Sequence, residues 1–185
     1  MPIFPIKTDR MFLVPATVKL YLLELHNREA FISTLRAKVP ETWPPDQVTP
    51  EVIEEYICRM KARDRKVWSF YWLLCEQESE VPILIGNGGF LCHNNGILEL
   101  GYSVLPEYQR KGYATEAVRS MLEWAFLNIK KDKIIAYTYP QLNASIRVLE
   151  KNGFMFKGKT HNESMLIYEL LNKNTISGSI FKNDK

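Results

Sequence analysis

The sequence predicts an α/β domain in which helices pack in layers against a mixed sheet. Three observations support this fold class. Apolar segments with strand spacing alternate with amphipathic helical segments, in the order ββββαβαββ with a helical insert after the first strand. A polar turn at residues 105–112 joins one strand directly to a helix. The 185 residues, of which 46% are hydrophobic and 24% charged, can bury one substantial core.

The N-terminal part is expected to contain one strand and a broken helix. An irregular start with Pro2 and Pro5 precedes a strand at residues 11–15. Residues 17–38 have helical character, with an interruption expected near residues 26–27. Prolines at positions 40, 44 and 45 then predict a loop.

A second helix of the insert begins at residues 49–51. Thr49 offers a capping side chain, Pro50 suits the first turn, and Glu51 places an acid near the positive end of the helix. Apolar residues then recur at helical spacing and predict one buried stripe: Val52, Ile53, Tyr56, Ile57 and Met60.

Three strands are expected next, at residues 67–75, 81–91 and 97–105, and residues 93–96 form the hairpin turn between the last two. In the first of them every second residue is aromatic or aliphatic, as the stripe Trp68, Phe70, Trp72 and Leu74 shows. This stripe is interpreted as sheet core rather than as a stacking platform for nucleic-acid bases.

The C-terminal half alternates helices and strands. Apolar residues at helical spacing from 114 to 125 predict a helix, and residues 134–139 a strand. Asn143 begins another helix, which Gly153 ends in a left-handed conformation. Strands at 154–159 and 164–171 complete the domain, expected at residues 1–171, and a polar, loose tail is expected at residues 172–185.

The turn before the helix at residue 113 has the features of a phosphate-binding loop. A helix N-terminus presents free N–H groups and a positive dipole end, so several donors can converge on an anion. Gly112 allows close backbone approach, small Ala114 keeps the first turn open, and Arg110 and Lys111 add positive charge. Neither the G-x-x-x-x-G-K-[ST] motif nor the G-x-G-x-x-G motif is present there.

The loop pattern Gln109-x-x-Gly112-x-Ala114 resembles the acetyl-coenzyme A signature of the Gcn5-related N-acetyltransferase (GNAT) superfamily. Residues 143–154 resemble the later cofactor-binding helix of that superfamily, and residues 85–90 resemble the strand that precedes the cofactor strand. The likeness covers residues 10–171 and is greatest to the branch of ribosomal-protein N-terminal (alanine) acetyltransferases. It implies a mostly antiparallel mixed sheet of about six to seven strands, with a splayed strand pair that holds the cofactor.

The resemblance implies acetyl-CoA as co-substrate and no metal. Its pyrophosphate would lie on the loop, mostly through backbone N–H groups, and its pantetheine arm would run beside the preceding strand. Asn143 would hydrogen-bond the arm, with a simple helix N-cap as the alternative, and Arg147 would reach a phosphate unless it only faces solvent. The implied cofactor-binding residues are therefore Tyr102, Ser103, Val104, Gln109, Arg110, Lys111, Gly112, Tyr113, Ala114, Thr115, Asn143 and Arg147.

Glu99 is the candidate general base. By strand alternation it shares a face with Gly101 and Ser103, and small residues beside an acid indicate a groove. The resemblance supports this role, because some relatives use a glutamate at this position as the base. The alternative is a solvated glutamate. Trp43 lies in the proline-rich loop that borders the acceptor groove in relatives, and it would either bind the acceptor or stiffen a surface loop.

The general acid departs from the common pattern of the superfamily. Leu149 occupies the position of the tyrosine that protonates the leaving sulfur in many relatives. The branch resembled here usually lacks the tyrosine too, and the resemblance implies that a serine matching Ser145 takes the role, either by protonating the thiolate or only by hydrogen-bonding it. Tyr137 and Tyr139, at the end of the preceding strand, are alternative donors.

The expected activity is transfer of an acetyl group to a primary amine, with a protein α-amine as one acceptor. Small-molecule acceptors (an antibiotic, a polyamine or an amino acid) remain open. A non-catalytic acyl-CoA-binding module and a basic protein that binds RNA or the ribosome, through the basic run at 59–66, are the other hypotheses.

Charge, hydropathy and cysteine usage restrict the classes of binding partner and the compartment that are expected for this protein. A net charge of +3 does not indicate nucleic-acid binding, and no apolar run approaches the length of a membrane span. The three cysteines are scattered without metal-site spacing, which favours a reducing cytoplasm and argues against both a disulfide scaffold and a zinc site. The sequence predicts no particular oligomeric state.

Overall fold

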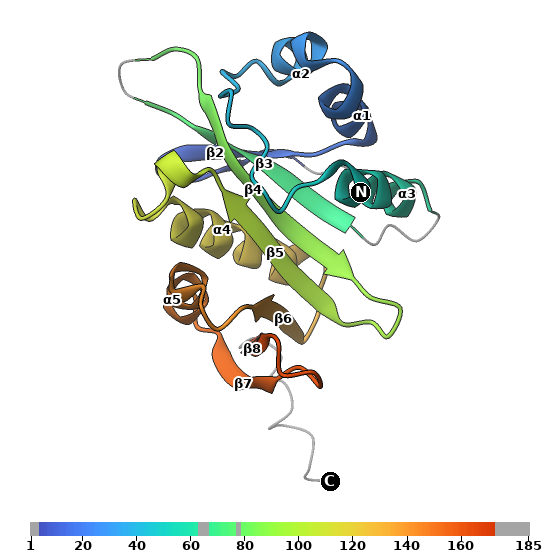
Figure 1. Ribbon diagram of the computed structural model, residues 1–185, viewed down its shortest axis with the longest axis vertical. Coiled ribbons are helices and arrows are strands. Elements are labelled where there is room, and N and C mark those ends of the chain that lie inside the picture. The colour runs from blue at the N-terminus through green and yellow to red at the C-terminus, as the bar shows by residue number, and fades with distance from the viewer. Residues whose placement is uncertain (1–3, 63–66, 77–78, 173–185) are drawn as a thin grey trace, which may run out of the picture.

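The computed structural model describes residues 4–62, 67–76 and 79–172. These residues form one sheet of eight strands in the order β1-β2-β3-β4-β5-β6-β8-β7 (Figure 1). The strands are β1 (Ile6–Lys7), β2 (Met11–Pro15), β3 (Val67–Leu74), β4 (Ile83–Cys92), β5 (Leu98–Val104), β6 (Lys133–Thr138), β7 (Met155–Lys159) and β8 (Leu166–Leu171). The count exceeds the prediction because the N-terminus is not irregular: Ile6 pairs with Leu13 and adds β1.

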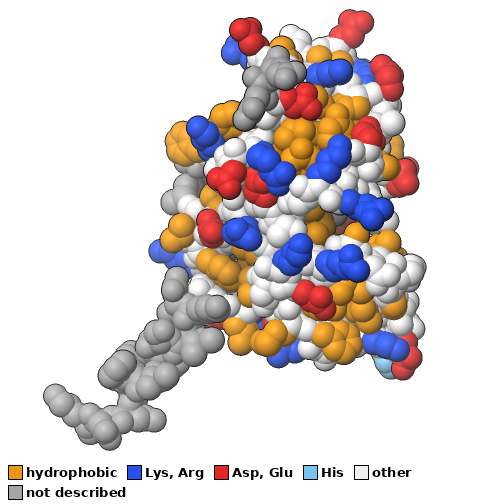
Figure 2. Space-filling view, turned by 90° about the vertical axis from the view of Figure 1, so that its left-hand side faces the viewer, with side chains coloured by type: hydrophobic (Ala, Val, Ile, Leu, Met, Phe, Trp, Pro, Cys, Tyr) orange, Lys and Arg blue, Asp and Glu red, His pale blue; other side chains and the backbone are white. Residues whose placement is uncertain are grey.

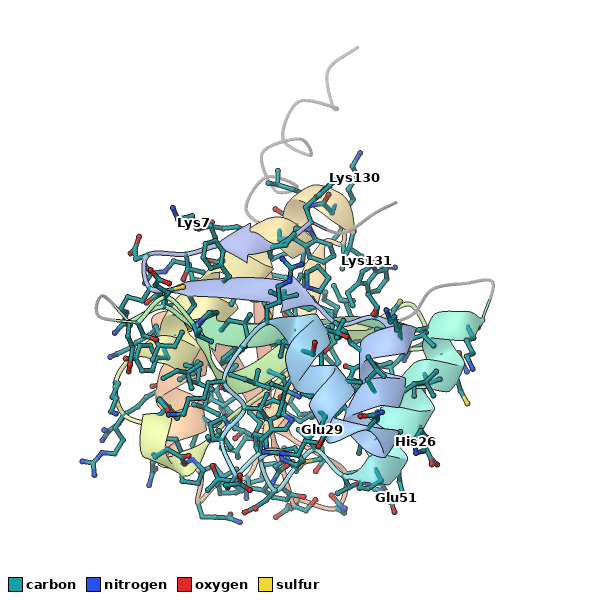
Figure 3. All side chains as sticks on the ribbon, turned by 90° about the horizontal axis from the view of Figure 1, so that it is seen from above. Lys7, His26, Glu29, Glu51, Lys130 and Lys131 are labelled. Atoms are coloured by element: carbon teal, nitrogen blue, oxygen red, sulfur yellow. The ribbon has the colours of Figure 1, made fainter. Side chains whose placement is uncertain are left out.

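The helices cover both faces of the sheet (Figures 1 and 3). They are α1 (Val18–His26), α2 (Arg28–Leu35) and α3 (Pro50–Lys61) on one face, and α4 (Tyr113–Asn128) and α5 (Asn143–Lys151) on the other. In β3 the side chains alternate between the layers: Phe70 and Trp72 pack with the α4 side, and Tyr71 and Leu73 with the α1–α3 side. The aromatic stripe is therefore sheet core, as predicted.

Capping residues set the ends of the inserted helices. Asn27 separates α1 from α2, and its side chain accepts a hydrogen bond from the Ala30 N–H, so the predicted break is confirmed. The helix ends at Leu35 rather than residue 38, because Arg36 adopts a left-handed conformation. Thr49 precedes α3 as predicted but makes no side-chain cap bond there. Its hydroxyl instead bonds Glu51 and lowers the pKa of that carboxyl.

Two glycines of β4 allow unusually close packing. A Cβ at Gly88 would lie 2.7 Å from the Trp72 ring, and one at Gly89 would lie 2.0 Å from the Trp68 carbonyl oxygen. The Trp72 indole consequently lies flat over β4 and stacks on Tyr102, with centroids 6.5 Å apart and planes at 21°.

The sheet opens between β5 and β6. These two strands are parallel and pair only at Leu98 with Ile134 and at Glu99 with Ile135. Yet β5 continues to Val104 and β6 to Thr138. Their ends diverge, so the splayed strand pair is present, and the rest of this β5 edge has its backbone groups unpaired with β6. All other neighbouring strands are antiparallel.

The ends of two predicted segments lie outside the described residues. Asn172, expected in the loose tail, is buried and its backbone N–H donates to the Asp132 carbonyl at 2.8 Å, while residues 173–185 are not described. Arg59 of the basic run pairs with Glu55 on α3, and residues 63–66 are not described.

None of the described helices combines the length and apolar character needed to cross a bilayer.

Candidate active site

A cleft of about 950 Å³ follows the opening between β5 and β6, with the α3 side at one end and the start of α4 at the other. It collects most of the residues that the sequence pointed to, and three of them lie elsewhere: Trp43, Lys111 and Asn143 do not line it. The predicted residues that line the cleft are Glu99, Tyr102, Ser103, Val104, Gln109, Arg110, Gly112, Tyr113, Ala114, Thr115, Tyr137, Tyr139, Ser145 and Arg147.

The loop before α4 presents backbone donors to this cleft. Arg110 and Gly112 both have positive φ, at 62° and 84°, so successive N–H groups converge instead of alternating. Within the described part of the chain, the backbone N–H groups of residues 110–115 have no hydrogen-bond acceptor, and no side chain caps α4. The loop can therefore bind an anion through its backbone.

Positive side chains surround the same end of the cleft. Figure 2 shows Lys and Arg side chains gathered in the middle of the face that carries the loop before α4 and the start of α5. Arg110, Arg147 and Lys151 line the cleft. Lys111 instead turns its ammonium toward the Tyr108 ring, 5.4 Å from the centroid.

The loop is tied to the end of β5 by a side chain. The Gln109 amide nitrogen donates to the Val104 carbonyl oxygen at 3.1 Å. Gln109 thus fixes the path of the chain from the strand into the loop, a role that its place in the motif did not predict.

The wall of the cleft formed by β6 contains a buried hydroxyl. Thr138 is 3% exposed, and its Oγ1 has no hydrogen-bond partner among the described residues. A buried hydroxyl without a partner is unfavourable unless a ligand or water satisfies it. Asn143, predicted nearby, is exposed, and Leu142 occupies the N-cap position of α5 without a side-chain cap bond. The N-cap alternative for Asn143 is therefore wrong, because the helix already includes it.

The first turn of α5 meets β5 through Ser145 and Tyr102. The Tyr102 hydroxyl lies 3.0 Å from Ser145 Oγ and donates to the Ser145 carbonyl oxygen at 3.1 Å. Burial, opposed by the hydrogen bond with Ser145, raises the pKa of Tyr102 to about 12, so the phenol stays protonated at neutral pH. Leu149, one turn further along α5, is fully buried in the core and does not line the cleft.

Glu99 lies where the β5–β6 pairing ends, and a histidine holds its carboxylate. His93 Nε2 is 2.6 Å from Glu99 Oε2, with both side chains partly exposed. The sequence interpretation did not include this contact. The hairpin register contained the signal, because Leu91 pairs with Glu99 and strand alternation then places His93 on the same face.

The far end of the cleft is lined by tyrosines from the helical insert. Burial, followed by the charge of Glu99, raises the pKa of Tyr56 on α3. Burial also raises the pKa of Tyr21 on α1, whose hydroxyl bonds Ser69. The two rings lie 6.2 Å apart and form an apolar wall, and Tyr56 is close enough to Glu99 for the charge of that carboxylate to act on its hydroxyl.

The proline-rich loop closes this end, but not through Trp43. Residues 45–48 line the cleft, whereas Trp43 is 5% exposed and belongs to the core. Its indole N–H donates to Glu24 at 2.7 Å, and the Tyr71 hydroxyl donates to the other oxygen of Glu24 at 2.5 Å. Burial raises the pKa of Glu24 against the effect of these two bonds. Trp43 therefore anchors the loop rather than lining the groove.

Comparison with known proteins gives a family match. The model of the acetyltransferase (GNAT) domain matches residues 18–155. The uncharacterized N-acetyltransferase YjdG of Bacillus subtilis is 28% identical over 99 residues, which are 52% of this chain and 58% of that protein. The chain spans about half the length of the curated relatives it matches.

Solved structures share the fold at low identity. The ribosomal-protein-S5-alanine acetyltransferase of Vibrio fischeri superposes with a TM-score of 0.62 at 18% identity, over 92% of this chain and 97% of that one. RimJ of Mycobacterium smegmatis, solved in complex with CoA-disulfide, gives a TM-score of 0.62 at 18% identity, over 92% and 87% of the two chains.

Proposed function

This chain belongs to the GNAT family of acetyltransferase domains, and on that premise we propose that it transfers an acetyl group from acetyl-CoA to a primary amine. One observation carries the proposal: the donor-lined loop at residues 110–115 and the open edge of β5 lie in a single cleft that Glu99 also lines. A long ligand with an anion at one end and a reactive group at the other fits this arrangement.

The residues present fit acetyl-CoA. The backbone N–H groups of residues 110–115 would hold the pyrophosphate, with Arg110 and Arg147 adding charge. The edge of β5 that faces the opening, at Tyr102 and at the Val104 N–H, would pair with the amide groups of the pantetheine arm, while Gln109 already bonds the Val104 carbonyl. The orphaned hydroxyl of Thr138 supports this placement, because an arm in the opening supplies the polar partner that the described protein residues do not.

Bound acetyl-CoA supplies an activated thioester, and the amine must reach it without its extra proton. Glu99 would accept that proton, directly or through water. The lone pair of the amine nitrogen would then be free to attack the carbonyl carbon of the thioester. His93 contacts Glu99 and is open to solvent, so it would pass the proton outward and restore the carboxylate. This chemistry suits an α-amine, since neutralising it at pH 7 costs about 1 kcal/mol against about 5 for a lysine.

Ser145 is proposed to donate a hydrogen bond to the leaving sulfur and to relay to it the proton that the attacking nitrogen loses as the amide forms, so that the serine hydroxyl is regenerated. The Tyr102 hydroxyl lies 3.0 Å from the Ser145 hydroxyl and would help to orient it. Tyr139 also lines the cleft but is 40% exposed, and it remains the second candidate with Tyr137. Leu149 has no part in this step, because the core encloses it.

The acceptor is proposed to be a protein N-terminal α-amine. The contact between the Glu99 carboxylate and His93, which offers a path for one proton to solvent, supports this class, and similarity to the S5-alanine acetyltransferase of V. fischeri points in the same direction. We also propose that the protein works in a reducing cytoplasm, because the described residues Cys58, Cys75 and Cys92 are free.

A transfer assay separates the possible acceptors. Thiol release from acetyl-CoA is measured with four separate acceptors. The first is a peptide that begins with alanine, and the second is that peptide with a blocked N-terminus and an added lysine. The third is spermidine, and the fourth is an aminoglycoside. The proposal predicts release with the free α-amine and none with the blocked peptide. Preference for a small amine would overturn the acceptor class alone. Acetyl-CoA binding without transfer to any amine would favour a non-catalytic binding module.

A further inference from the structure

The turn between β1 and β2 packs against the loop before α4, although the two lie far apart in the sequence (Figure 1). Glu116, in the first turn of α4, accepts hydrogen bonds from Thr8 Oγ1 at 2.6 Å and from the Arg10 backbone N–H at 2.8 Å. The other carboxylate oxygen of Glu116 accepts a hydrogen bond from Arg10 Nε at 2.7 Å. The turn is thereby attached to α4 by three bonds to one carboxylate.

The Arg10 guanidinium extends these contacts into the loop. Its Nη1 donates to the Lys111 carbonyl oxygen at 3.1 Å, and its carbon lies 4.4 Å from the centroid of the Tyr113 ring. A Cβ at Gly112 would lie 3.4 Å from Arg10 Nη2. Arg10 therefore contacts Lys111 and Tyr113 and lies beside Gly112, and it does so from outside, because it does not line the cleft.

The bond to Lys111 determines where a loop donor points. The Lys111 carbonyl and the Gly112 N–H belong to one planar trans peptide, so they point in opposite directions. With the carbonyl turned to Arg10, the Gly112 N–H must point to the opposite side. Positive φ at Arg110, which is not glycine, also needs support from its surroundings.

We propose that Arg10 is a positioning residue that holds the loop at residues 109–115 in its anion-binding conformation before the ligand arrives. Glu116 fixes the guanidinium, and the guanidinium fixes the Lys111–Gly112 peptide. The identity of the ligand as coenzyme A rests on the proposed function above. The preorganised loop loses less conformational freedom on binding, so the arginine strengthens binding without touching the ligand.

The test combines amide hydrogen exchange of the free protein with calorimetric titration of coenzyme A. Arg10→Ala is expected to speed exchange in residues 109–115 and to weaken coenzyme A binding by about tenfold, the size of one charged hydrogen bond. Lys133→Ala is the matched control, because Lys133 pairs at 3.0 Å with Glu169, a carboxylate as buried as Glu116. It should leave both measurements unchanged.

Arg10→Lys separates positioning from simple charge. Lysine keeps the positive charge but loses the fork that joins Glu116 to Lys111, so it should behave like Arg10→Ala. Wild-type affinity in Arg10→Lys, or unchanged loop exchange in both variants, would overturn the proposal. If wild-type protein binds no coenzyme A, the proposed function fails, and loop exchange alone then decides the role of Arg10. If Arg10→Ala does not fold, loop exchange and coenzyme A affinity are compared with wild type in Glu116→Gln and Arg10→Lys instead.

Discussion

Glu99 and His93 lie 2.6 Å apart at the point where β5 and β6 separate. Strand alternation placed Glu99 on the cleft face correctly, whereas His93 was missed because it lies in the turn and six residues away in the sequence. Contacts across a hairpin depend on register, and register is fixed by the turn, here with Gly96 at φ 81°. Arg10 was missed for a stronger reason: its partners are a hundred residues away.

Glu99→Gln should lower kcat by about 10²- to 10⁴-fold, because the amine loses its proton acceptor. The deficit should shrink as pH rises from 7 to 9, since more of the α-amine is then neutral without a base. Steady-state rates with an alanine-initiated peptide measure both effects. Coenzyme A affinity serves as the control and should not change. An equal deficit at every pH would argue against a base role for Glu99.

Glu116→Gln should destabilise the protein in a pH-dependent way. Burial opposes ionisation of Glu116, but hydrogen bonds from Thr8 and Arg10 outweigh it and lower the pKa of this carboxyl below 4.5. A lowered folded-state pKa contributes stability that is complete above about 4.5 and lost as pH falls through the lowered value. The variant should therefore be less stable than wild type by about 1 kcal/mol at pH 7.

Denaturant unfolding of both proteins between pH 7 and pH 3 measures this difference. The gap should close on acidification, because wild-type Glu116 then becomes neutral as well. A gap that stays constant down to pH 3 would show that the charge of Glu116 is not what stabilises the β1–β2 turn.

At the scale of elements, β4 depends on its glycines. Gly89→Ala should destabilise the protein by more than about 2 kcal/mol, because its methyl group would meet the Trp68 carbonyl oxygen of β3 at 2.0 Å. Gly101→Ala on β5 is the control: a Cβ there has no neighbour within 4 Å among the described residues. Thermal or denaturant unfolding should leave Gly101→Ala within about 0.5 kcal/mol of wild type. Equal losses in the two variants would contradict the close packing of β3 on β4.

The loop that borders the acceptor end depends on α1 through one hydrogen bond. Trp43→Phe removes the N–H that Glu24 accepts and leaves a buried carboxylate with one donor fewer. The variant should lose about 1–3 kcal/mol of stability and raise the acceptor KM, with coenzyme A affinity unchanged. Denaturation and saturation kinetics measure the two effects. A weakened coenzyme A affinity with a normal acceptor KM would contradict the claim that the loop anchored by Trp43 borders the acceptor end of the cleft.

For the whole molecule, periodicity in the sequence predicted the order of elements and the mixed sheet, because periodicity is a local signal, whereas the splay was implied by the resemblance to the GNAT superfamily. The sequence did not predict β1, whose two residues form a strand only by pairing with β2. It left open whether Trp43 binds the acceptor or stiffens a surface loop, because a proline-rich loop gives no indication of which side chain turns inward. Most of the cleft residues lie within or beside the recognised motifs, and those outside them needed the tertiary structure.

The central claim is that acetyl-CoA occupies the opening between β5 and β6. The most direct measurement is calorimetric titration of acetyl-CoA into wild type, Gly101→Leu and Val81→Leu. A leucine at 101 enters open space within the cleft, whereas Val81 is exposed and does not line the cleft. Saturable one-to-one binding by wild type and Val81→Leu, lost in a folded Gly101→Leu, is the predicted result. Unchanged binding in Gly101→Leu, or none by wild type, would contradict the account.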